Sequence, residues 1–386
     1  MKNFKTPIVK SVCFFIPYKP LRKKLRKFLL EWSLPGALNF RQLKKHKISP
    51  ETVLVIEPND CHGEVVPGYV KYFLDMGFNV DVILHSSVSK DRPLCRMDSP
   101  RLRVFALDYY YLRKISEAGR LGEYAHVLLT SGAYYHYCQF EDFSAVKILG
   151  LEQMKNLLIV EHDLNNIKNF NETHFLKNNQ VIVLGNLPEG IMVNPHCFGN
   201  VKITPKNKIT NFVVVGGINP KRKNHHLIEN AVQTLVRKGY KNFKIKVIGG
   251  KVSDISKDLE RYIECSKGYV SFPEMYKEME NADFFLTLLD ENNPAHERYI
   301  TTGVTGSAQL VYGFCKPAVI PAKFADFYGF DETNAMIVNN GDLAAAMQDA
   351  IDMSEDEYNR IQGNLSTLAT AVYSLSFNNL RDIINA

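Results

Sequence analysis

The chain has 386 residues, of which 45% are hydrophobic and 23% charged, and its formal net charge is +6. This is an ordinary globular composition with no low-complexity tract, and the length is enough for two domains, each with its own core. No run of eighteen apolar residues occurs, so no transmembrane helix is predicted. The seven cysteines are scattered without CxxC pairs, which argues against a structural zinc site or a disulfide framework and favours a reducing, cytosolic setting.

The first predicted element is a basic amphipathic helix within residues 19–34, KPLRKKLRKFLLEWSL. One helical face carries Leu21, Leu25, Phe28, Leu29 and Trp32, and the other carries Arg22, Lys23, Lys24, Arg26 and Lys27. This pattern is typical of a helix on an anionic membrane surface, although a helix packed on its own domain with a solvated basic face gives the same pattern. A secretory signal is not expected, because the apolar stretch 12–16 is short and precedes the basic block. A nucleic-acid partner is not expected either, because no aromatic residues interleave with the cations.

Strands and helices then alternate through the first half of the chain. Apolar runs rich in β-branched residues predict strands at 52–56, 80–84, 101–107, 126–130, 157–161 and 180–184. The helix after the first strand has Pro67 in its first turn and Gly77 just past its end. Strands separated by helical segments indicate a parallel, doubly wound sheet.

A second alternating pattern begins after residues 200–211, NVKITPKNKITN, where a change in composition marks a linker. Its predicted strands are 212–215, 243–248, 284–289, 318–320 and 335–338. Beyond them, Ser354 and Glu357 form a capping box for one helix, and residues 377–384 predict a last amphipathic helix. We therefore predict two Rossmann-like domains in tandem. The expected parts are a basic segment 1–48, a first domain 49–203, a second domain 204–366 and a helical segment 367–386 that packs back on the first domain.

The first strand-to-helix turn of the second domain, VVVGGINPKRKNHH, combines glycines with cations. The residues concerned are Gly216, Gly217, Lys221, Arg222, Lys223 and Asn224. The glycines permit a sharp reversal, the cations crowd the start of the next helix, and the asparagine can cap that helix. A helix N-terminus with added cations favours an anion such as a diphosphate. The alternative is a tight turn closed by glycines, with solvated cations.

A second turn of this kind precedes the strand at 318–320. Thr305, Gly306 and Ser307 stand where a helix should begin, and small residues there let backbone N–H groups approach an anion. Capping alone also explains a Thr or Ser at such a place. Because two such turns occur in one domain, we interpret them as two walls of one phosphate pocket.

Acids and histidines cluster after two strands of the first domain. His62 and Glu64 lie with Asp60 in the loop PNDCHGE, and His162 and Asp163 directly follow Glu161, the last residue of the strand at 157–161. Ligands bind at the carboxyl ends of parallel strands, so the two histidines, Glu64 and Asp163 are candidate catalytic residues. Either histidine could instead be an ordinary loop residue, and an acid in the first turn of a helix, such as Glu64, is favourable without a ligand.

Together, the two domains, the phosphate-type turns, the segment KGYVSFPEMYKEMENADFFLTLL and the terminal helices resemble a GT-B glycosyltransferase. The resemblance covers roughly residue 52 onward and is most specific at 213–320. The piece SVCFFIPYKPLRKKLRKFL also resembles the leader of bacterial transferases that build capsule or lipopolysaccharide. The resemblance implies a nucleotide-sugar donor in the second domain, a glycan or lipid-linked glycan acceptor in the first, and transfer in the cleft between them. It further implies a cytoplasmic enzyme, peripheral on the inner face of the membrane, with no cofactor.

The resemblance also implies roles for particular residues. The glycine and lysine turn and the Thr305 turn would hold the diphosphate, and the loop 269–273 would lie against the nucleobase. Glu291 or Glu297 would bind hydroxyls of the donor. Many retaining members place two glutamates eight positions apart, whereas these are six apart, which leaves the stereochemistry open. In an inverting enzyme His162 or Asp163 would accept the acceptor's proton, and in a retaining enzyme His162 would bond the donor sugar.

No metal-binding motif is visible in the sequence. The cations and helix dipoles of the second domain are expected to stabilise the departing diphosphate directly. A nucleotide-sugar epimerase of the same fold and a noncatalytic scaffold for polysaccharide assembly are the alternatives. An NAD-dependent oxidoreductase is disfavoured, because PNDCHGE lacks the GxGxxG fingerprint.

Overall fold

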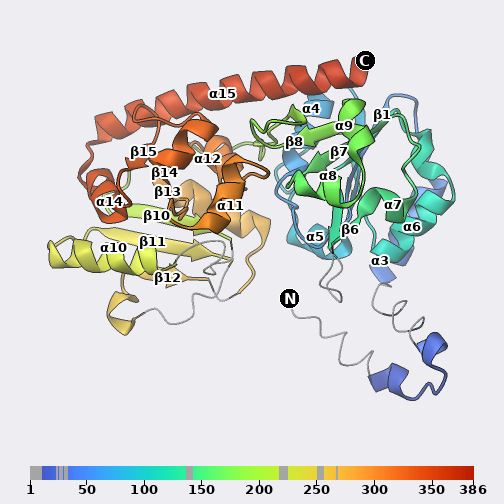
Figure 1. Cartoon of the computed structure of the whole chain (residues 1–386), viewed down its shortest axis with the longest axis horizontal. Helices are drawn as coiled ribbons and strands as arrows, with labels where there is room; N and C mark the ends of the chain where they lie inside the picture. Colours follow the sequence, from blue (N-terminus) through green and yellow to red (C-terminus); the bar gives the residue numbers. More distant parts are fainter. Residues whose placement is uncertain are drawn as a thin grey trace.

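The computed structural model contains two parallel sheets, one in each half of the chain (Figure 1). It describes residues 11–22, 25, 29, 34–135, 142–216, 225–249, 256–266 and 268–386. Both sheets start near the middle and grow outward in both directions, which is the order of a doubly wound fold. The predicted fold class, two Rossmann-like domains in tandem, is confirmed.

The first sheet has the order β3-β2-β1-β4-β7-β8-β9, and all its pairings are parallel. Its strands are β1 (Thr52–Glu57), β2 (Asn79–Leu84), β3 (Leu102–Ala106), β4 (His126–Leu129), β7 (Leu157–Glu161), β8 (Val181–Val183) and β9 (Ile191–Met192). β1 and β7 are buried at every residue. Their uninterrupted apolar runs follow from this, because both faces of a parallel sheet are covered.

The helices of this half connect the strands and cover the sheet (Figure 1). They are α3 (Leu34–Lys45), α4 (Val66–Asp75), α5 (Ser86–Asp91), α6 (Tyr109–Glu117), the 3-10 helix η1 (Arg120–Glu123), α7 (Ala145–Leu149), α8 (Asn165–Asn169) and α9 (Thr173–Lys177). Alternate residues of β1 belong to different apolar clusters: Val53 and Val55 to one, Leu54 and Ile56 to the other. The sheet is therefore packed on both faces.

The second sheet has the order β12-β11-β10-β13-β14-β15, again all parallel. Its strands are β10 (Thr210–Val215), β11 (Phe243–Ile248), β12 (Ile263–Cys265), β13 (Phe284–Leu286), β14 (Ala318–Pro321) and β15 (Met336–Val338). Its helices are α10 (His225–Arg237), η2 (Lys257–Leu259), α11 (Phe272–Asn281), η3 (Pro294–Ile300), α12 (Ser307–Phe314), α13 (Ala322–Ala325), η4 (Asp326–Tyr328), α14 (Leu343–Asp352) and α15 (Glu355–Asn385).

Some details of the strand prediction were wrong. The strand expected at 284–289 ends at Leu286, because Leu288 adopts the left-handed conformation with φ of 53°. β9, β12 and the antiparallel hairpin β5 (Ala133–Tyr135) and β6 (Asp142–Ser144) were not expected. Each has only two or three residues, which is too short for an alternating pattern to stand out.

The chain ends in one continuous helix, α15, of 31 residues that crosses both halves of the molecule (Figure 1). Ser354 Oγ accepts from Glu357 N at 3.2 Å, as the capping box predicts. The expectation of a separate last helix at 377–384 was wrong. Buried side chains recur every three or four residues along the whole length, so a single stripe faces the protein: Tyr358, Ile361, Leu365, Ala369, Val372, Ser376 and Leu380.

The second half of α15 contacts the first domain. Asn194 N donates to Ser376 Oγ at 2.9 Å, and Asn379 Nδ2 donates to the carbonyl of Met192 at 2.8 Å. The rings of Tyr72 and Tyr373 lie 4.9 Å apart. One apolar cluster includes Val53 of β1 together with residues of the second domain and of α15, so the two domains share a continuous core.

The segment between the sheets, 200–209, contains no helix or strand. Glu280 on α11 holds it: Arg96 of the first domain binds both carboxylate oxygens at 2.7 and 2.9 Å, and Lys202 N donates to the same carboxylate at 2.8 Å. Tyr276 on the same helix donates its hydroxyl to the carbonyl of Pro93 at 2.9 Å. α11 therefore fixes the joint from the side of the second domain.

Most of the basic N-terminal helix predicted at 19–34 lies outside the described residues, which include 19–22, 25, 29 and 34 of that range. In residues 11–22 the large apolar side chains are mostly exposed, among them Phe14 at 74% and Phe15 at 83%. No helix within the described residues is both long and apolar enough to span a bilayer.

Candidate active site

Most of the predicted site residues lie at the carboxyl edges of the two sheets, at or beside the points where strand order reverses. In the first sheet this point lies between β1 and β4, and in the second between β10 and β13. In doubly wound folds the loops of adjacent strands diverge at such points, and ligands bind there. His62 and Glu64 follow β1, Glu291 follows β13, and Gly216 follows β10.

The structure brings His62 and His162 together. Their ring centroids lie 4.2 Å apart at an interplanar angle of 30°. His162 Nε2 lies 2.9 Å from the carbonyl of Thr130. Since a carbonyl can only accept, Nε2 carries the proton and Nδ1 of the neutral ring is left to accept. Burial, together with the neighbouring His62, lowers the pKa of His162 to about 3, so this ring is neutral at physiological pH.

His62 behaves in the opposite way. Its Nδ1 lies 3.4 Å from Glu64 Oε1, and its backbone is left-handed with φ of 61°. Burial opposes the charged ring, but hydrogen bonds with Cys61 and Glu64 outweigh it and raise the pKa of His62. Burial alone would raise the pKa of Glu64. The hydrogen bond and the charge of the adjacent His62 outweigh burial, so the pKa of Glu64 is lowered. The pair therefore consists of one neutral imidazole and one imidazole that binds a proton readily.

A buried carboxyl group lies between the loops that hold the two histidines. Glu57, the last residue of β1, is fully buried and accepts from Asn59 N at 2.7 Å. Its other oxygen accepts from the hydroxyls of Thr130 and Ser131, both at 2.8 Å. Burial raises the pKa of Glu57 to about 7. Glu57 thus joins the loop that carries His62 to the loop whose carbonyl holds His162.

The last residue of β7, Glu161, is also buried, and burial raises its pKa to about 8. Its Oε2 accepts from Asn166 Nδ2 at 3.1 Å, while Oε1 has no hydrogen-bond partner among the described residues. A Cβ atom at Gly132 would lie 1.8 Å from Oε1, so only glycine fits there. Glu161 is consequently protonated at neutral pH and packs against the backbone of the loop after β4.

Asp163 links the two domains. Its Oδ2 lies 2.9 Å from Arg298 Nη2, and its backbone forms an antiparallel bridge with Gly303. Next to it, Leu164 N donates to the carbonyl of Thr302 at 2.7 Å. A Cβ atom at Gly303 would lie 2.8 Å from the carbonyl of His162, which explains the glycine. The carboxylate predicted as a possible base is occupied by an ion pair across the domain boundary.

The second wall begins at the N-terminus of α12, as predicted. Gly306 precedes the helix, and Thr305 Oγ1 accepts from Ser307 N at 3.3 Å. Thr305 N donates to the hydroxyl of Tyr328 at 3.0 Å. In the first turn Gln309 is buried, and neither Oε1 nor Nε2 of its amide has a partner among the described residues. An unpaired buried amide in the first turn of a helix is suited to a polar ligand.

Glu291 and Glu297 converge on one residue at the start of α13. Glu291 Oε1 accepts from Lys323 N at 3.0 Å, and Glu297 Oε2 forms an ion pair with Lys323 Nζ. Asn293 caps η3, and His296 Nδ1 accepts from Asp290 N at 2.9 Å, which orders the loop between the two glutamates. A role for either glutamate in donor binding stays a prediction.

At the first turn of the second domain, Gly216 has φ of 103°, which requires glycine, and its N–H extends the ladder to β11 by donating to Ile248 O at 2.9 Å. The other members of this turn lie outside the described residues. These are Gly217, Lys221, Arg222, Lys223 and Asn224. No group of three or more His, Cys, Asp or Glu side chains suited to a metal occurs in the described ranges.

Sequence reasoning missed several polar residues of this site: Glu57, Thr130, Ser131, Gln309, Arg298 and Lys323. One signal was available for Glu57. TVLVIE and LLIVE both place a single acid at the end of an apolar strand, at the carboxyl edge of the sheet. Arg298 carries no comparable signal, because its partner lies on the other domain.

Two parallel sheets of this strand order, joined at their carboxyl edges, define the GT-B fold. No protein-family model matches the chain, and no curated protein matches it by sequence. Solved structures match by fold. A variant of S. aureus TarM, in complex with Fondaparinux, alpha-GlcNAc-glycerol and UDP, is 12% identical with a TM-score of 0.56, covering 87% of this chain and 100% of that one.

Two further structures are similar over the same length. HepE from Anabaena, in complex with UDP and glucose, is 12% identical with a TM-score of 0.51, covering 87% of this chain and 100% of that one. A glycosyltransferase from Rickettsia africae ESF-5 is 12% identical with a TM-score of 0.50, covering 87% and 98%. At this identity the likeness concerns the fold, and the chain has the fold of these proteins.

Proposed function

We propose that the protein is a glycosyltransferase that moves a sugar from a nucleotide-diphosphate sugar to a growing surface glycan of the lipopolysaccharide, capsule or a related class. The fold shared with HepE, TarM and the Rickettsia transferase supports the enzyme class. Two of these structures hold UDP, so uridine donors come first in any test. In this proposal the transfer uses no resident cofactor and no metal.

The observation that carries the proposal is the unpartnered amide of Gln309 at the start of α12. Leaving a buried polar group unpaired costs about 1–3 kcal/mol, so a ligand that pairs with this amide is favoured. The N–H groups of the first turn carry partial positive charge and favour an anion. A nucleotide diphosphate supplies both the negative charge and the hydrogen-bonding oxygens.

The histidine loops of the first domain supply the remaining chemistry. Transfer breaks the bond between the sugar C1 and the diphosphate oxygen and forms a bond from C1 to the acceptor oxygen. The helix N-terminus stabilises the charge on the departing diphosphate. Neutral His162 offers Nδ1 to a hydroxyl of the donor sugar, and His62, backed by Glu64, takes the acceptor's proton when it is itself neutral.

A thermal-shift screen of the full chain against UDP, GDP, ADP and their sugars tests the donor site. At a hundred times the dissociation constant, a nucleotide adds about 2.7 kcal/mol to the stability of the folded state. Gln309→Leu should lower the affinity for the nucleotide at least tenfold. Gln233→Leu, at an exposed position on α10, should leave that affinity unchanged. No shift with any nucleotide would contradict a donor site. The products formed from the donor that binds separate the alternatives. Isomerisation of the donor without an acceptor would indicate an epimerase, and binding without any product would favour a scaffold.

We further propose that the N-terminal segment holds the enzyme on an anionic membrane surface at the cytoplasmic face, where lipid-linked acceptors lie. Support comes from the exposed Phe14, Phe15 and Tyr18, which adjoin the cations Lys19 and Arg22. Exposed aromatic side chains next to basic residues are typical of interfacial binding.

Vesicle cosedimentation tests this part separately from catalysis. The full chain should sediment with vesicles that contain phosphatidylglycerol and stay in solution with pure phosphatidylcholine. Replacing both Phe14 and Phe15 by Glu should release it, while Leu375→Glu, an exposed position on α15, should not. Equal sedimentation of the Phe14 and Phe15 double variant would refute membrane binding through this segment.

A further inference from the structure

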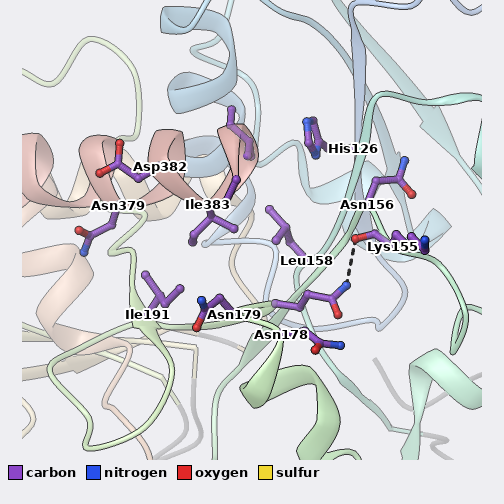
Figure 2. A pocket seen from close by; sticks show the side chains of 13 residues that line it. His126, Lys155, Asn156, Leu158, Asn178, Asn179, Ile191, Asn379, Asp382 and Ile383 are labelled. Atoms are coloured by element: carbon purple, nitrogen blue, oxygen red, sulfur yellow. Dashed lines mark hydrogen bonds between the residues drawn. The ribbon is translucent and has the colours of Figure 1, made fainter.

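A cavity of about 580 Å³ lies at the amino ends of strands in the first sheet, where the last turns of α15 close it on one side (Figure 2). His126 of β4, Asn156 before β7 and Gln180 before β8 line it from the sheet. Asn379 and Ile383 line it from α15. The volume falls within the range of small-molecule sites.

The cavity is distinct from the candidate active site. Asn156 precedes β7, whereas His162 follows its carboxyl end, so the two regions lie at opposite ends of the same five-residue strand. At 3.3 Å per residue the separation is about 15 Å or more, measured along the strand. A ligand in this cavity would therefore leave the loops that carry the two histidines free.

Backbone bonds fix the amide groups that face the cavity. Asn156 Nδ2 donates to the carbonyls of Tyr124 and Ala125 at 2.8 and 3.0 Å. Gln180 Nε2 donates to the carbonyl of Leu157 at 2.8 Å and to Lys155 O at 3.2 Å. Because the donor hydrogens of both amides are already used, each amide oxygen is held in place and remains to accept.

The rest of the wall combines aliphatic side chains with the amides of Asn178 and Asn179, and its charged side chains balance. Leu158 and Ile191 line it from the sheet, and Ile384 lines it from α15. The charged side chains are one cation, Lys155, and one anion, Asp382 (Figure 2). Burial lowers the pKa of His126, which keeps its ring neutral at physiological pH.

This combination selects one class of ligand. A phosphate group is favoured by cations or by the N–H groups of a helix N-terminus, and the charged side chains of this lining are Lys155 and the opposing acid Asp382. An acyl chain that filled the cavity would displace water from the fixed amide oxygens and supply no hydrogen-bond donor in its place, which is costly. A neutral saccharide presents hydroxyl donors around its rim and C–H groups on its faces, and so satisfies both kinds of wall.

We propose that this cavity is a second carbohydrate site that binds a neutral oligosaccharide. The inference rests on the proposed function only for its purpose: a transferase that holds its glycan at two places keeps the chain bound between additions. Binding itself follows from the cavity and is testable without turnover.

Saturation-transfer NMR and calorimetry on the full chain test the site, with neutral trisaccharides of glucose, N-acetylglucosamine, galactose and mannose as probes and saturating UDP present to occupy the transfer site. Ile384→Trp fills the cavity from the last turn of α15, and Leu375→Trp makes the same kind of change at an exposed position of that helix. Asn379→Ala removes one polar group of the lining as an independent variant. Melting temperature and UDP binding of each variant check its fold.

At least one trisaccharide should bind, Ile384→Trp should weaken it tenfold or more, and Leu375→Trp should leave it within twofold. Absence of binding by every trisaccharide overturns the inference, as does binding that Ile384→Trp and Asn379→Ala leave unchanged. The inference is also overturned if decanoate or inorganic phosphate binds in place of a saccharide and Ile384→Trp abolishes that binding. In all these cases retained nucleotide binding leaves the proposed function standing, whereas failure of every nucleotide diphosphate to bind the wild type counts against that function alone.

Discussion

Replacing Glu161 by Gln should make the fold more stable at neutral pH. Burial raises the pKa of this carboxyl group from 4.5 to about 8, so the folded protein keeps a proton that the unfolded chain releases. Between these two values the stability of the wild type falls as pH rises, and above them it levels off. Glutamine has the shape of the protonated acid and does not titrate, so it removes this loss.

The size of the effect follows from the same values. Each pH unit above 4.5 lowers the free energy of unfolding of the wild type by about 1.4 kcal/mol, which gives about 3 kcal/mol at pH 7. For a domain of this size that corresponds to roughly 6–12 °C in melting temperature. The geometry is compatible with glutamine, because its carbonyl can accept from Asn166 as Oε2 does now.

Thermal unfolding followed by far-UV circular dichroism between pH 5 and pH 8.5 measures the gap between variant and wild type. The gap should be near zero at pH 5 and widen steadily toward pH 8. Other titrating groups, including Glu57, are common to both proteins and cancel in the difference. Glu152→Gln, at an exposed position, serves as the matched control and should show no widening. A gap that is constant with pH would show that Glu161 is ionised in the fold.

Three further predictions concern the loops at the carboxyl edge of the first sheet and the residue that pairs with them. Gly132→Ala should lower the melting temperature by several degrees, because its Cβ would lie 1.8 Å from Glu161 Oε1, and pairing it with Glu161→Ala should recover part of the loss. Asp163→Asn and Arg298→Ala should each slow turnover, and the double variant should be no slower than the worse single one, since both break one ion pair; additive losses would contradict a shared role. If His62 is the base, its raised pKa means that kcat/KM rises with pH through that value, and His62→Ala should abolish the rise; a wild-type profile flat between pH 6 and 9 would exclude the role.

Much of the fold was predictable because the pattern is strong. The apolar run at 52–56 and the alternating segment at 243–248 gave strands at the right places, and glycines or prolines marked the ends of helices. The errors have local causes. Leu288 breaks its strand by a backbone conformation that no residue type announces, and the 31-residue α15 was divided because only its two ends carry clear signals.

The candidate site was predictable only within each loop. His62 and His162 were found because each follows a buried strand, but nothing in the sequence indicates that their rings meet at 4.2 Å or that one stays neutral. Asp163 and Arg298 are 135 positions apart and meet only when the two domains come together. Contacts of that kind depend on the relative placement of two sheets, which local patterns do not encode.

The long terminal helix has a consequence for how the protein is made. The first sheet is complete at Met192, yet Ser376 and Leu380, which cover that half of the molecule, are synthesised more than 180 residues later. At ordinary rates of translation the ribosome takes about 10–40 s to add that stretch. During this interval the nascent first half leaves the exit tunnel with the surface around Tyr72 uncovered, so its final assembly waits until α15 has been made and has left the tunnel.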